Sequence, residues 1–259
     1  MILTVDIGNS NIVLGGVDGE EIRFTARMVT DSIKTSDQYC AELKTMLDLF
    51  GVKLGEIEGS IVSSVVPPVL NSFRTALRKL TGKQCLVVGP GLRTGLNIKV
   101  ENPATVGADL VVGSVAALQS YKPPMILIDM GTATTIFVLD KSGALCGGAI
   151  LPGIKISLDA LTNCTALLPG ISLDQPKKAI GRNTIDCMRS GIMLGTACML
   201  DGMVERMEQE LGEKATVVIT GGIGKFIQPL CKTEMTYDGE LLTKGLVHLY
   251  HMNRRLLED

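Results

Sequence analysis

The amino-acid sequence predicts an α/β protein made of two related domains, each with a mixed or mainly parallel sheet covered by helices. Short apolar or β-branched runs bounded by Gly, Pro, Asp or Asn alternate with longer helix-like stretches along all 259 residues. A strand followed by Asp-x-Gly and a polar residue occurs at 1–10 and again at 125–134. The offset between the two aspartates, 129 − 6 = 123 residues, is close to half the chain and indicates a duplication.

The expected elements follow from these runs and from the residues that flank them. Strands are expected at 2–5, 12–17, 61–66, 85–88, 125–128, 135–139 and 217–220. Helices are expected at 36–50, 69–80, 107–121, 154–167, 184–212 and 240–257. Because prolines end a helix and stiffen a connector, Lys122-Pro123-Pro124 is expected to divide the chain into domains 1–121 and 122–259.

Composition excludes several classes of protein. With 46% apolar residues, 20% charged residues and a mean hydropathy of +0.30, the chain is expected to fold as a globule. A net charge of −2 and the absence of Trp argue against a nucleic-acid partner. The 7 cysteines are scattered without a C-x-x-C pair, and no apolar run approaches the roughly 18 to 20 residues of a membrane span. We therefore expect reduced thiols, no membrane contact and a cytoplasmic location.

The first candidate site is the turn after the first expected strand, Asp6-Ile-Gly8-Asn9-Ser10-Asn11. Gly8 lets the backbone approach an anion closely, and the side chains of Asn9 and Ser10 can donate hydrogen bonds to phosphate oxygens. Asp6, at the strand end, can hold a hydrated Mg²⁺. The alternative is an ordinary hairpin turn, in which the same residue types are favoured.

The second copy, Asp129-Met-Gly131-Thr132-Ala133-Thr134, strengthens the phosphate interpretation. Thr132 and Thr134 supply hydroxyl donors, and Asp129 can bind a cation directly or through water. Two such loops from similar domains are expected to face each other across a cleft and to hold one polyphosphate. The alternative for Thr134 is that it serves only as a β-forming residue.

A third glycine-rich element, Thr220-Gly221-Gly222, follows an expected strand and opens an expected helix. It can accommodate the adenosine or the α-phosphate of a nucleotide, or it is a β-α turn whose glycines only satisfy backbone geometry. The sequence contains neither G-x-x-x-x-G-K-[ST] nor a complete G-x-G-x-x-G. Neither a P-loop enzyme nor a Rossmann dehydrogenase is therefore predicted.

Asp109 lies in the first turn of an expected helix and has two interpretations. As a structural residue it complements the helix dipole, which is worth roughly 0.3 to 1 kcal/mol. As a catalytic residue it would accept a proton from, or orient, a substrate hydroxyl that attacks a γ-phosphate. The two histidines, His248 and His251, make neither a zinc site nor a histidine-based acid–base system easy to build.

Seven motifs occur in a recognisable order and spacing: D-I-G-N-S-N (6–11), S-S-V-V-P-P (63–68), G-P-G-L-R-T-G-L-N-I (89–98), N-P-x-x-V-G-A-D (102–109), D-M-G-T-A-T-T (129–135), G-G-A-I-L-P-G (147–153) and T-G-G (220–222). Together they resemble the type III pantothenate kinase family, nearly end to end. The resemblance implies two ribonuclease-H-like domains of the actin-like ATPase fold with a nucleotide cleft between them. It also implies ATP-dependent phosphorylation of pantothenate, the first step towards coenzyme A, with Mg²⁺, a monovalent cation (K⁺ or NH₄⁺) and a homodimer.

The resemblance also assigns roles to individual residues. Asp109 would be the catalytic carboxylate, and Asp6 and Asp129 would hold the metal or cation. The residues expected to contact ATP are Asp6, Gly8, Asn9, Ser10, Asn11, Gly131, Thr132, Thr134, Gly221 and Gly222. The residues expected to contact pantothenate are Val100, Gly107, Ala108, Asp109, Leu110 and Thr184.

Four positions depart from the family's pattern. Leu110 stands in place of an arginine, Gly113 of an asparagine, Val100 of an aromatic residue and Leu167 of a lysine. A missing cation beside an anionic substrate costs roughly 1.5 to 3 kcal/mol, or about one to two decades in affinity. These departures support an alternative: a divergent paralogue that binds nucleotide in a regulatory role or phosphorylates a different small hydroxyl acceptor.

Overall fold

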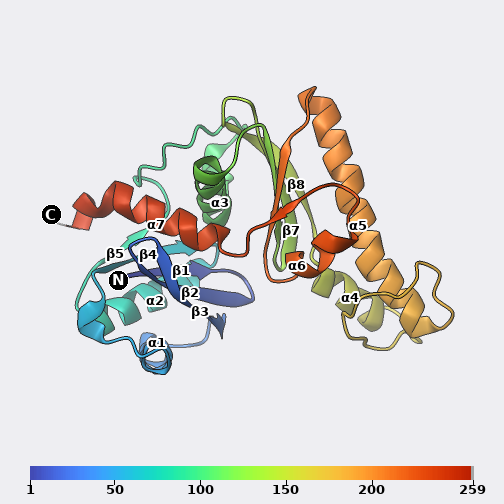
Figure 1. The fold of residues 1–259 in the computed structure, drawn as a ribbon. Coiled ribbons are helices and arrows are strands. Elements are labelled where there is room, and N and C mark those ends of the chain that lie inside the picture. Colours follow the sequence, from blue (N-terminus) through green and yellow to red (C-terminus); the bar gives the residue numbers. More distant parts are fainter. Residues whose placement is uncertain (258–259) are drawn as a thin grey trace. The chain divides into compact units, whose positions relative to one another are not determined.

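The structure is a computed structural model that describes residues 1–257 (Figure 1). Its strands are β1 (Ile2–Ile7), β2 (Asn11–Asp18), β3 (Glu21–Val29), β4 (Gly59–Ser64), β5 (Cys85–Val87), β6 (Met125–Met130), β7 (Ala133–Leu139), β8 (Leu145–Pro152), β9 (Thr216–Thr220) and β10 (Thr236–Tyr237). Its α-helices are α1 (Ser36–Leu49), α2 (Pro67–Thr81), α3 (Ala108–Ser120), α4 (Ile154–Asn163), α5 (Thr184–Leu211), α6 (Gly224–Ile227) and α7 (Leu241–Asn253). Short 3₁₀ helices lie at Leu54–Glu56, Pro103–Thr105, Gln228–Leu230 and Arg254–Leu257.

The strands form two five-stranded sheets with the same topology. The first has the order β3-β2-β1-β4-β5, and the second has the order β8-β7-β6-β9-β10. In each sheet the first three strands are antiparallel neighbours, and the last two continue parallel to the central strand. The duplication that the sequence predicts is therefore confirmed, with β1 and β6 as equivalent central strands.

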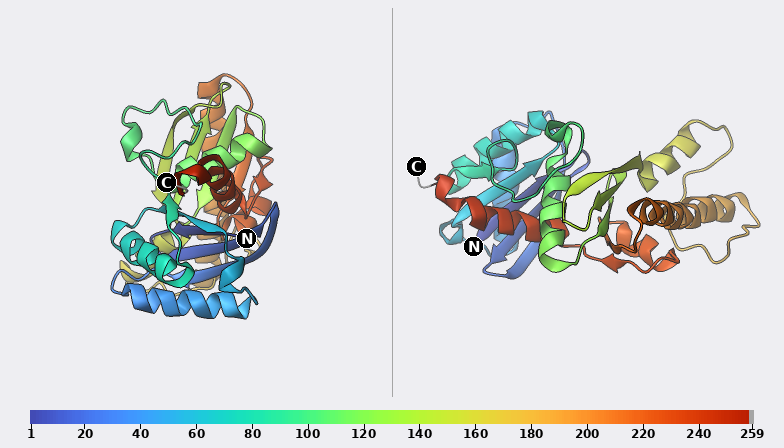
Figure 2. Two further views of the ribbon diagram at one scale, coloured as in Figure 1. Left: turned by 90° about the vertical axis from the view of Figure 1, so that its left-hand side faces the viewer. Right: turned by 90° about the horizontal axis from the view of Figure 1, so that it is seen from above.

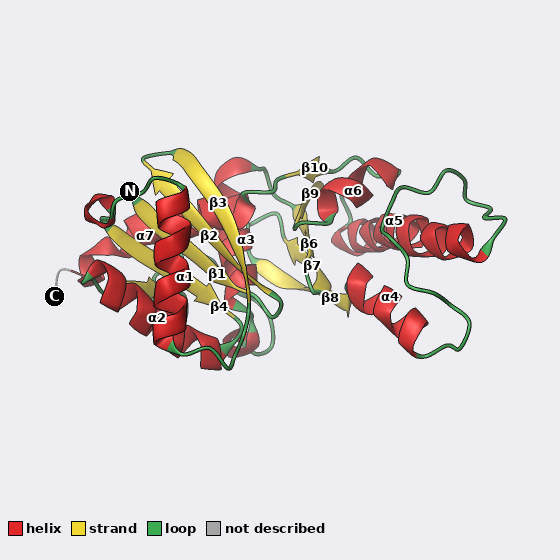
Figure 3. Ribbon diagram, turned by 90° about the horizontal axis from the view of Figure 1, so that it is seen from below, coloured by secondary structure: helices red, strands yellow, loops and turns green. Residues whose placement is uncertain are grey.

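The first sheet is covered by helices on both faces (Figures 2 and 3). Successive side chains of a strand point to opposite faces, so Leu3, Val5 and Ile7 pack in one cluster with residues of α1 and α2. Ile2 of β1 and Ile61 of β4 belong to another cluster, which contains residues of α3 and α7. Both faces of this sheet are therefore covered by packed helices, which explains why most residues of β1 are apolar.

The second sheet has its own core. Ile126, Ile128 and Met130 of β6 are buried in a cluster with residues of α4, α5 and α6. Methionines of α5, among them Met188 and Met193, fill much of this core in place of aromatic residues. The flexible thioether side chain suits such irregular gaps, which is consistent with the 12 Met and 5 Phe of the chain.

The compact units of the structure differ from the division predicted at 121/122. The first unit comprises Met1–Leu96, Asn102–Ala116 and the chain from Leu241 on, and the second comprises Asn97–Glu101 and Ala117–Glu240. The last helix, α7, joins the first unit because its Leu246, Leu249 and Tyr250 are buried against the first sheet. The division at 116/117 falls inside α3, upstream of the prolines at 123 and 124.

Most expected elements are present, with boundaries that differ by a few residues. The strands β3, β8 and β10 were not expected, and the helix expected at 154–167 ends at Asn163. The third glycine-rich element is followed by only four residues of α-helix, α6. Within residues 1–257, none of the helices has the length and apolar character needed to cross a membrane.

Candidate active site

The first acidic loop connects β1 to β2. Asp6 is the penultimate residue of β1, where it pairs with Val13 of β2 and with Ser63 of β4, and it is partly buried. The backbone N–H of Gly8 donates to the carbonyl of Asn11 across 3.0 Å and closes the turn. Asn9, Ser10 and Asn11 are exposed, so their polar side chains are accessible to a ligand.

Thr30, which directly follows β3, holds this loop in place. Its hydroxyl donates to the carbonyl oxygen of Gly8 at 2.7 Å, and its backbone N–H donates to that of Ser10 at 3.0 Å. These bonds satisfy two loop carbonyls and fasten the turn to the residue that follows β3. Sequence reasoning missed Thr30, because nothing local signals a contact between residues 22 positions apart.

The second acidic loop connects β6 to β7 at the equivalent place. Asp129 is the penultimate residue of β6 and pairs with Thr135 of β7 and with Thr220 of β9. The N–H of Gly131 donates to the carbonyl of Ala133 at 3.0 Å, so this turn is one residue tighter than the first. Gly131 and Thr132 are exposed, whereas Thr134 is a buried strand residue. Of the two predicted threonines, Thr132 therefore offers the accessible hydroxyl.

Two glycines from outside this loop support it. A Cβ atom at Gly153, between β8 and α4, would lie 2.1 Å from the carbonyl oxygen of Thr132. Gly221 has a φ of +89°, and a Cβ atom there would lie 2.5 Å from the carbonyl oxygen of Met130. Any larger residue at either position would displace the loop backbone. The sequence contains Gly153 within the motif G-G-A-I-L-P-G, but its contact with Thr132 becomes visible only in the fold.

The third glycine-rich element lies in the second unit with the second loop. Thr220 ends β9 beside Asp129, and Gly221 and Gly222 connect it to α6. Because α6 has only four residues, it does not provide the N-terminal anion site of a longer helix. The structure thus gives Gly221 a packing role, and the nucleotide contacts of Gly221 and Gly222 stay predictions.

Asp109 lies in the first turn of α3, in the first unit. Its Oδ1 accepts a hydrogen bond of 2.8 Å from the backbone N–H of Leu110. Burial raises the pKa of the Asp109 carboxyl above its usual value, and the backbone hydrogen bonds oppose this only in part. A partly desolvated carboxylate with a raised pKa is a better proton acceptor than an exposed aspartate, which favours the catalytic interpretation.

The residues expected to contact the acceptor are distributed over both units. Gly107 to Leu110 lie at the start of α3 in the first unit, and all are partly buried. Val100 is partly buried in the short 97–101 segment of the second unit. Thr184 is the exposed first residue of α5, beside its N-cap Asn183. That these residues form one pocket stays a prediction, as does the meeting of the two acidic loops.

The side chains of the two acidic loops are suited to a metal ion that is bound together with phosphate. Within residues 1–257, no group of three or more His, Cys, Asp or Glu side chains is placed to hold a metal ion by itself. Each acidic loop instead offers one carboxylate next to hydroxyl or amide groups. Mg²⁺ typically keeps several waters and is bound by one or two carboxylates together with substrate phosphates, so these residues fit that ion.

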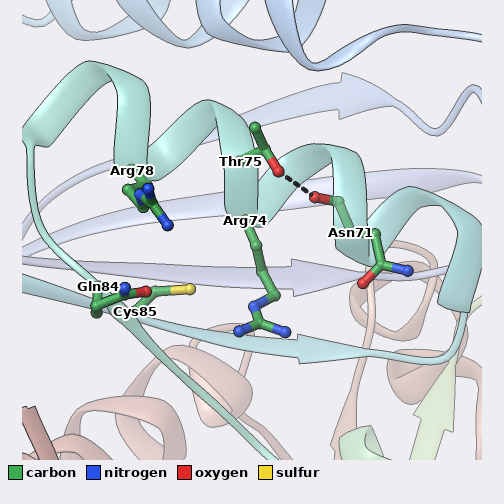
Figure 4. Close-up of a pocket in the computed structure, with 6 residues that line it drawn as sticks. All are labelled: Asn71, Arg74, Thr75, Arg78, Gln84 and Cys85. Atoms are coloured by element: carbon green, nitrogen blue, oxygen red, sulfur yellow. Dashed lines mark hydrogen bonds between the residues drawn. The ribbon is translucent and has the colours of Figure 1, made fainter.

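A surface hollow of about 170 Å³ lies elsewhere, between α2 and β5 (Figure 4). Arg74 extends from α2 towards the strand that carries Cys85, and burial raises the pKa of the Cys85 thiol. The residues that line this hollow are Asn71, Arg74, Thr75, Arg78, Gln84 and Cys85. None of the predicted site residues is among them, so the hollow is separate from the candidate active site.

Comparisons with known proteins show what the chain is similar to. A family model described as type III pantothenate kinase matches residues 2–206. A type III pantothenate kinase of Exiguobacterium sp. is 43% identical over 98% of this chain and 100% of its own length, and one of Bacillus cytotoxicus is 42% identical over 100% and 99%. Component A of the (R)-2-hydroxyglutaryl-CoA dehydratase of Acidaminococcus fermentans is 13% identical and covers 98% of both chains with a TM-score of 0.57. This last likeness shows the fold alone, that of the actin-like ATPases with two duplicated ribonuclease-H-like domains.

Proposed function

The chain belongs to the type III pantothenate kinase family, and we propose that it transfers the γ-phosphoryl group of ATP to the primary hydroxyl of pantothenate. The product is 4'-phosphopantothenate, and the reaction is the first step of coenzyme A biosynthesis. Because the reaction consumes ATP, we infer a cytoplasmic location.

One observation carries the proposal beyond family membership. Each of two sheets of identical topology has an aspartate, Asp6 or Asp129, as the penultimate residue of its central strand, followed by a glycine turn with exposed polar side chains. A single turn of this kind is common, but its recurrence at equivalent places in both sheets is expected of a duplicated fold in which each copy contributes phosphate contacts. We therefore assign ATP phosphate contacts to Asn9, Ser10 and Thr132.

Asp109 is the residue proposed to act on the acceptor. Its carboxylate would accept a hydrogen bond from the hydroxyl of pantothenate and orient the hydroxyl oxygen towards the γ-phosphorus. Phosphoryl transfer through a loose transition state depends mainly on positioning and on stabilisation of charge, so a carboxylate suffices as base. The backbone N–H of Leu110 fixes the orientation of this carboxylate.

Asp6 and Asp129 are proposed to hold the cations. When bound, Mg²⁺ neutralises charge on the phosphate oxygens. Asp6 would hold the hydrated ion that accompanies ATP, and Asp129 would hold a cation directly or through water. A monovalent cation, K⁺ or NH₄⁺, is proposed as a further requirement on the basis of the family.

A coupled assay of ADP release tests this function. We expect pantothenate-dependent ADP release that requires Mg²⁺ and increases with K⁺ or NH₄⁺. The acceptor panel should include pantothenate and small alcohols without its carboxylate, because Leu110 stands where the family has a cation. Binding of ATP in calorimetry without ADP release from any acceptor would instead support the regulatory alternative.

A homodimer is also proposed, through a surface of the second unit. Large apolar side chains are exposed on and around β8, α4 and the start of α5: Ile150, Ile156, Leu161, Leu167, Ile180 and Ile185. Exposed apolar side chains that gather in one part of a chain commonly mark an interface. A second copy of the chain is the partner that the family implies.

Changing Ile180→Asp should weaken the dimer at least about tenfold, because it would bury a charge at the interface. Analytical ultracentrifugation over a range of concentrations measures the dissociation constant. Ile33→Asp is the matched control, since Ile33 is 89% exposed and Ile180 is 82% exposed, but Ile33 lies in the first unit. Equal effects of the two changes, or none from Ile180→Asp, would place the interface elsewhere.

A further inference from the structure

Ser63 carries a buried hydroxyl without a partner. Among residues 1–257, the Oγ atoms of Ser63 and Ser114 are the buried side-chain polar atoms that lack a hydrogen bond. Ser63 is 0% exposed. Buried polar groups are nearly always hydrogen-bonded, because an unsatisfied hydroxyl lowers the stability of the folded state. The unpaired hydroxyl of Ser63 therefore needs an explanation, and one explanation is a role in ligand binding.

Ser63 lies directly beside Asp6. The two residues are register partners on the parallel neighbours β1 and β4. On β4, Ile61 lies two residues before Ser63 and packs in the cluster with α3 and α7. On β1, Thr4 lies two residues before Asp6. A Cβ atom placed at Gly15 would touch both Thr4 and Thr243 of α7, so Thr4 faces α7 as well. Because alternate residues of a strand share a face, Ser63 and Asp6 are on the same face, on strands about 4.8 Å apart.

The neighbouring serine shows that the local chain can satisfy a hydroxyl. Ser64 Oγ accepts a hydrogen bond of 3.0 Å from the N–H of Val66 and lies 3.3 Å from its carbonyl oxygen. Ser63 is oriented to the other face of the strand, where no such turn is available. Its lack of a partner is therefore specific to its position beside Asp6.

The duplication repeats this arrangement. In the second sheet, Thr220 of β9 is the register partner of Asp129, as Ser63 of β4 is of Asp6. Thr220 is also buried. A hydroxyl thus stands beside each strand-end aspartate, although the residues around the two sites differ.

We propose that Ser63 is a positioning residue whose hydroxyl donates a hydrogen bond to the Asp6 carboxylate when that carboxylate turns to hold the cation brought by ATP. The inference rests on the proposed function, in which Asp6 holds hydrated Mg²⁺. Carboxylates that ligate metals are usually held by a further hydrogen bond, and removal of such a partner lowers metal affinity about 10- to 100-fold. The Ser63 hydroxyl is available for this bond, because it has no other hydrogen-bond partner in the structure.

Ser63→Ala separates this role from a structural one. We expect the melting temperature of the ligand-free protein to stay unchanged or to rise, because an unpaired buried hydroxyl is removed. The apparent affinity for Mg²⁺, titrated by calorimetry at saturating ATP without pantothenate, should fall about tenfold. Affinity for ATP in the presence of EDTA should not change.

Ser114→Ala is the matched control, because it removes the other unpaired buried hydroxyl. It should change stability as Ser63→Ala does and leave the Mg²⁺ titration unchanged. Ser63→Thr, which introduces the residue found at the equivalent position 220, should retain most of the Mg²⁺ affinity. If threonine is too large for the site, the comparison of the two alanine variants still decides.

Two different failures can be distinguished. Wild-type protein that binds no Mg–ATP would overturn the proposed function and the inference with it. Wild-type protein that binds Mg–ATP, together with unchanged Mg²⁺ affinity in Ser63→Ala, would overturn the inference alone. A parallel loss of affinity in Ser114→Ala would also overturn it, because the effect would then not be specific to Asp6.

Discussion

Asp109→Asn should lower kcat about a thousandfold while ATP binding stays nearly intact, within the range of 10²- to 10⁴-fold known for general bases. Asparagine keeps the size of the side chain, and its oxygen can still accept the hydrogen bond from the Leu110 N–H. It has no charge and does not accept a proton from the acceptor hydroxyl. Steady-state kinetics with pantothenate and calorimetry with ATP measure the two quantities separately.

The control for this variant is an aspartate in the same helical position that is exposed. Asp37 lies in the first turn of α1 as Asp109 lies in that of α3, and it forms an ion pair with Lys79. If Asp109 served only the helix dipole, Asp37→Asn and Asp109→Asn would both have small effects on stability and none on turnover. Turnover at the wild-type rate in Asp109→Asn would remove this residue from the mechanism.

The raised pKa of Asp109 gives this variant a second readout. Between the pKa of the unfolded chain and the raised pKa of the folded protein, the folded state binds more protons, so stability falls as pH increases. The contribution of protonated Asp109 is fully present below the unfolded pKa and is lost as pH rises through the folded one. We expect Asp109→Asn to remove this slope from the free energy of unfolding. In wild type, the acidic limb of kcat/KM should lie at higher pH than an exposed aspartate would give.

The parts of the site that sequence predicts well are those built from neighbouring residues. The repeat of strand, aspartate and glycine at 6–8 and 129–131 contains its own strand and turn signals, so the equivalent loops could be placed without coordinates. The same holds for the position of Asp109, which lies in the first turn of a mainly apolar helix. The strand order of the two sheets then confirms that these loops are equivalent.

The parts that sequence predicts poorly depend on contacts between distant segments. Thr30 supports the first loop, and Gly153 the second, through contacts that no local pattern reveals. The helix α7 follows the second sheet in the chain but is buried on the first, because its apolar face matches Ile2 and Ile61. The strand β3 alternates buried apolar residues, such as Phe24 and Met28, with exposed polar residues, such as Arg27, so it contains no continuous apolar run that would mark it as a strand.

Gly221→Ala should reduce the free energy of unfolding by about 2 to 4 kcal/mol, the sum of two effects. Alanine disfavours a φ of +89°, and this strain costs on the order of 1 kcal/mol. The added Cβ would also lie 2.5 Å from the Met130 carbonyl oxygen and would push β9 away from β6, which typically costs 1 to 3 kcal/mol. Urea unfolding followed by circular dichroism measures the sum.

Gly212→Ala separates the two effects and decides between the interpretations of the third glycine element. Gly212 caps α5 with a φ of +75°, and no atom lies within 4 Å of a Cβ placed there, so its substitution reports backbone strain alone. Any loss of unfolding free energy in Gly221→Ala beyond that in Gly212→Ala measures the collision with Met130. Met130 directly precedes the loop that contains Thr132. Displacement of Met130 should therefore also lower the affinity for ATP. If the two variants lose equal stability and only Gly221→Ala loses ATP affinity, Gly221 acts by contacting the nucleotide. Its packing against β6 would then be incidental.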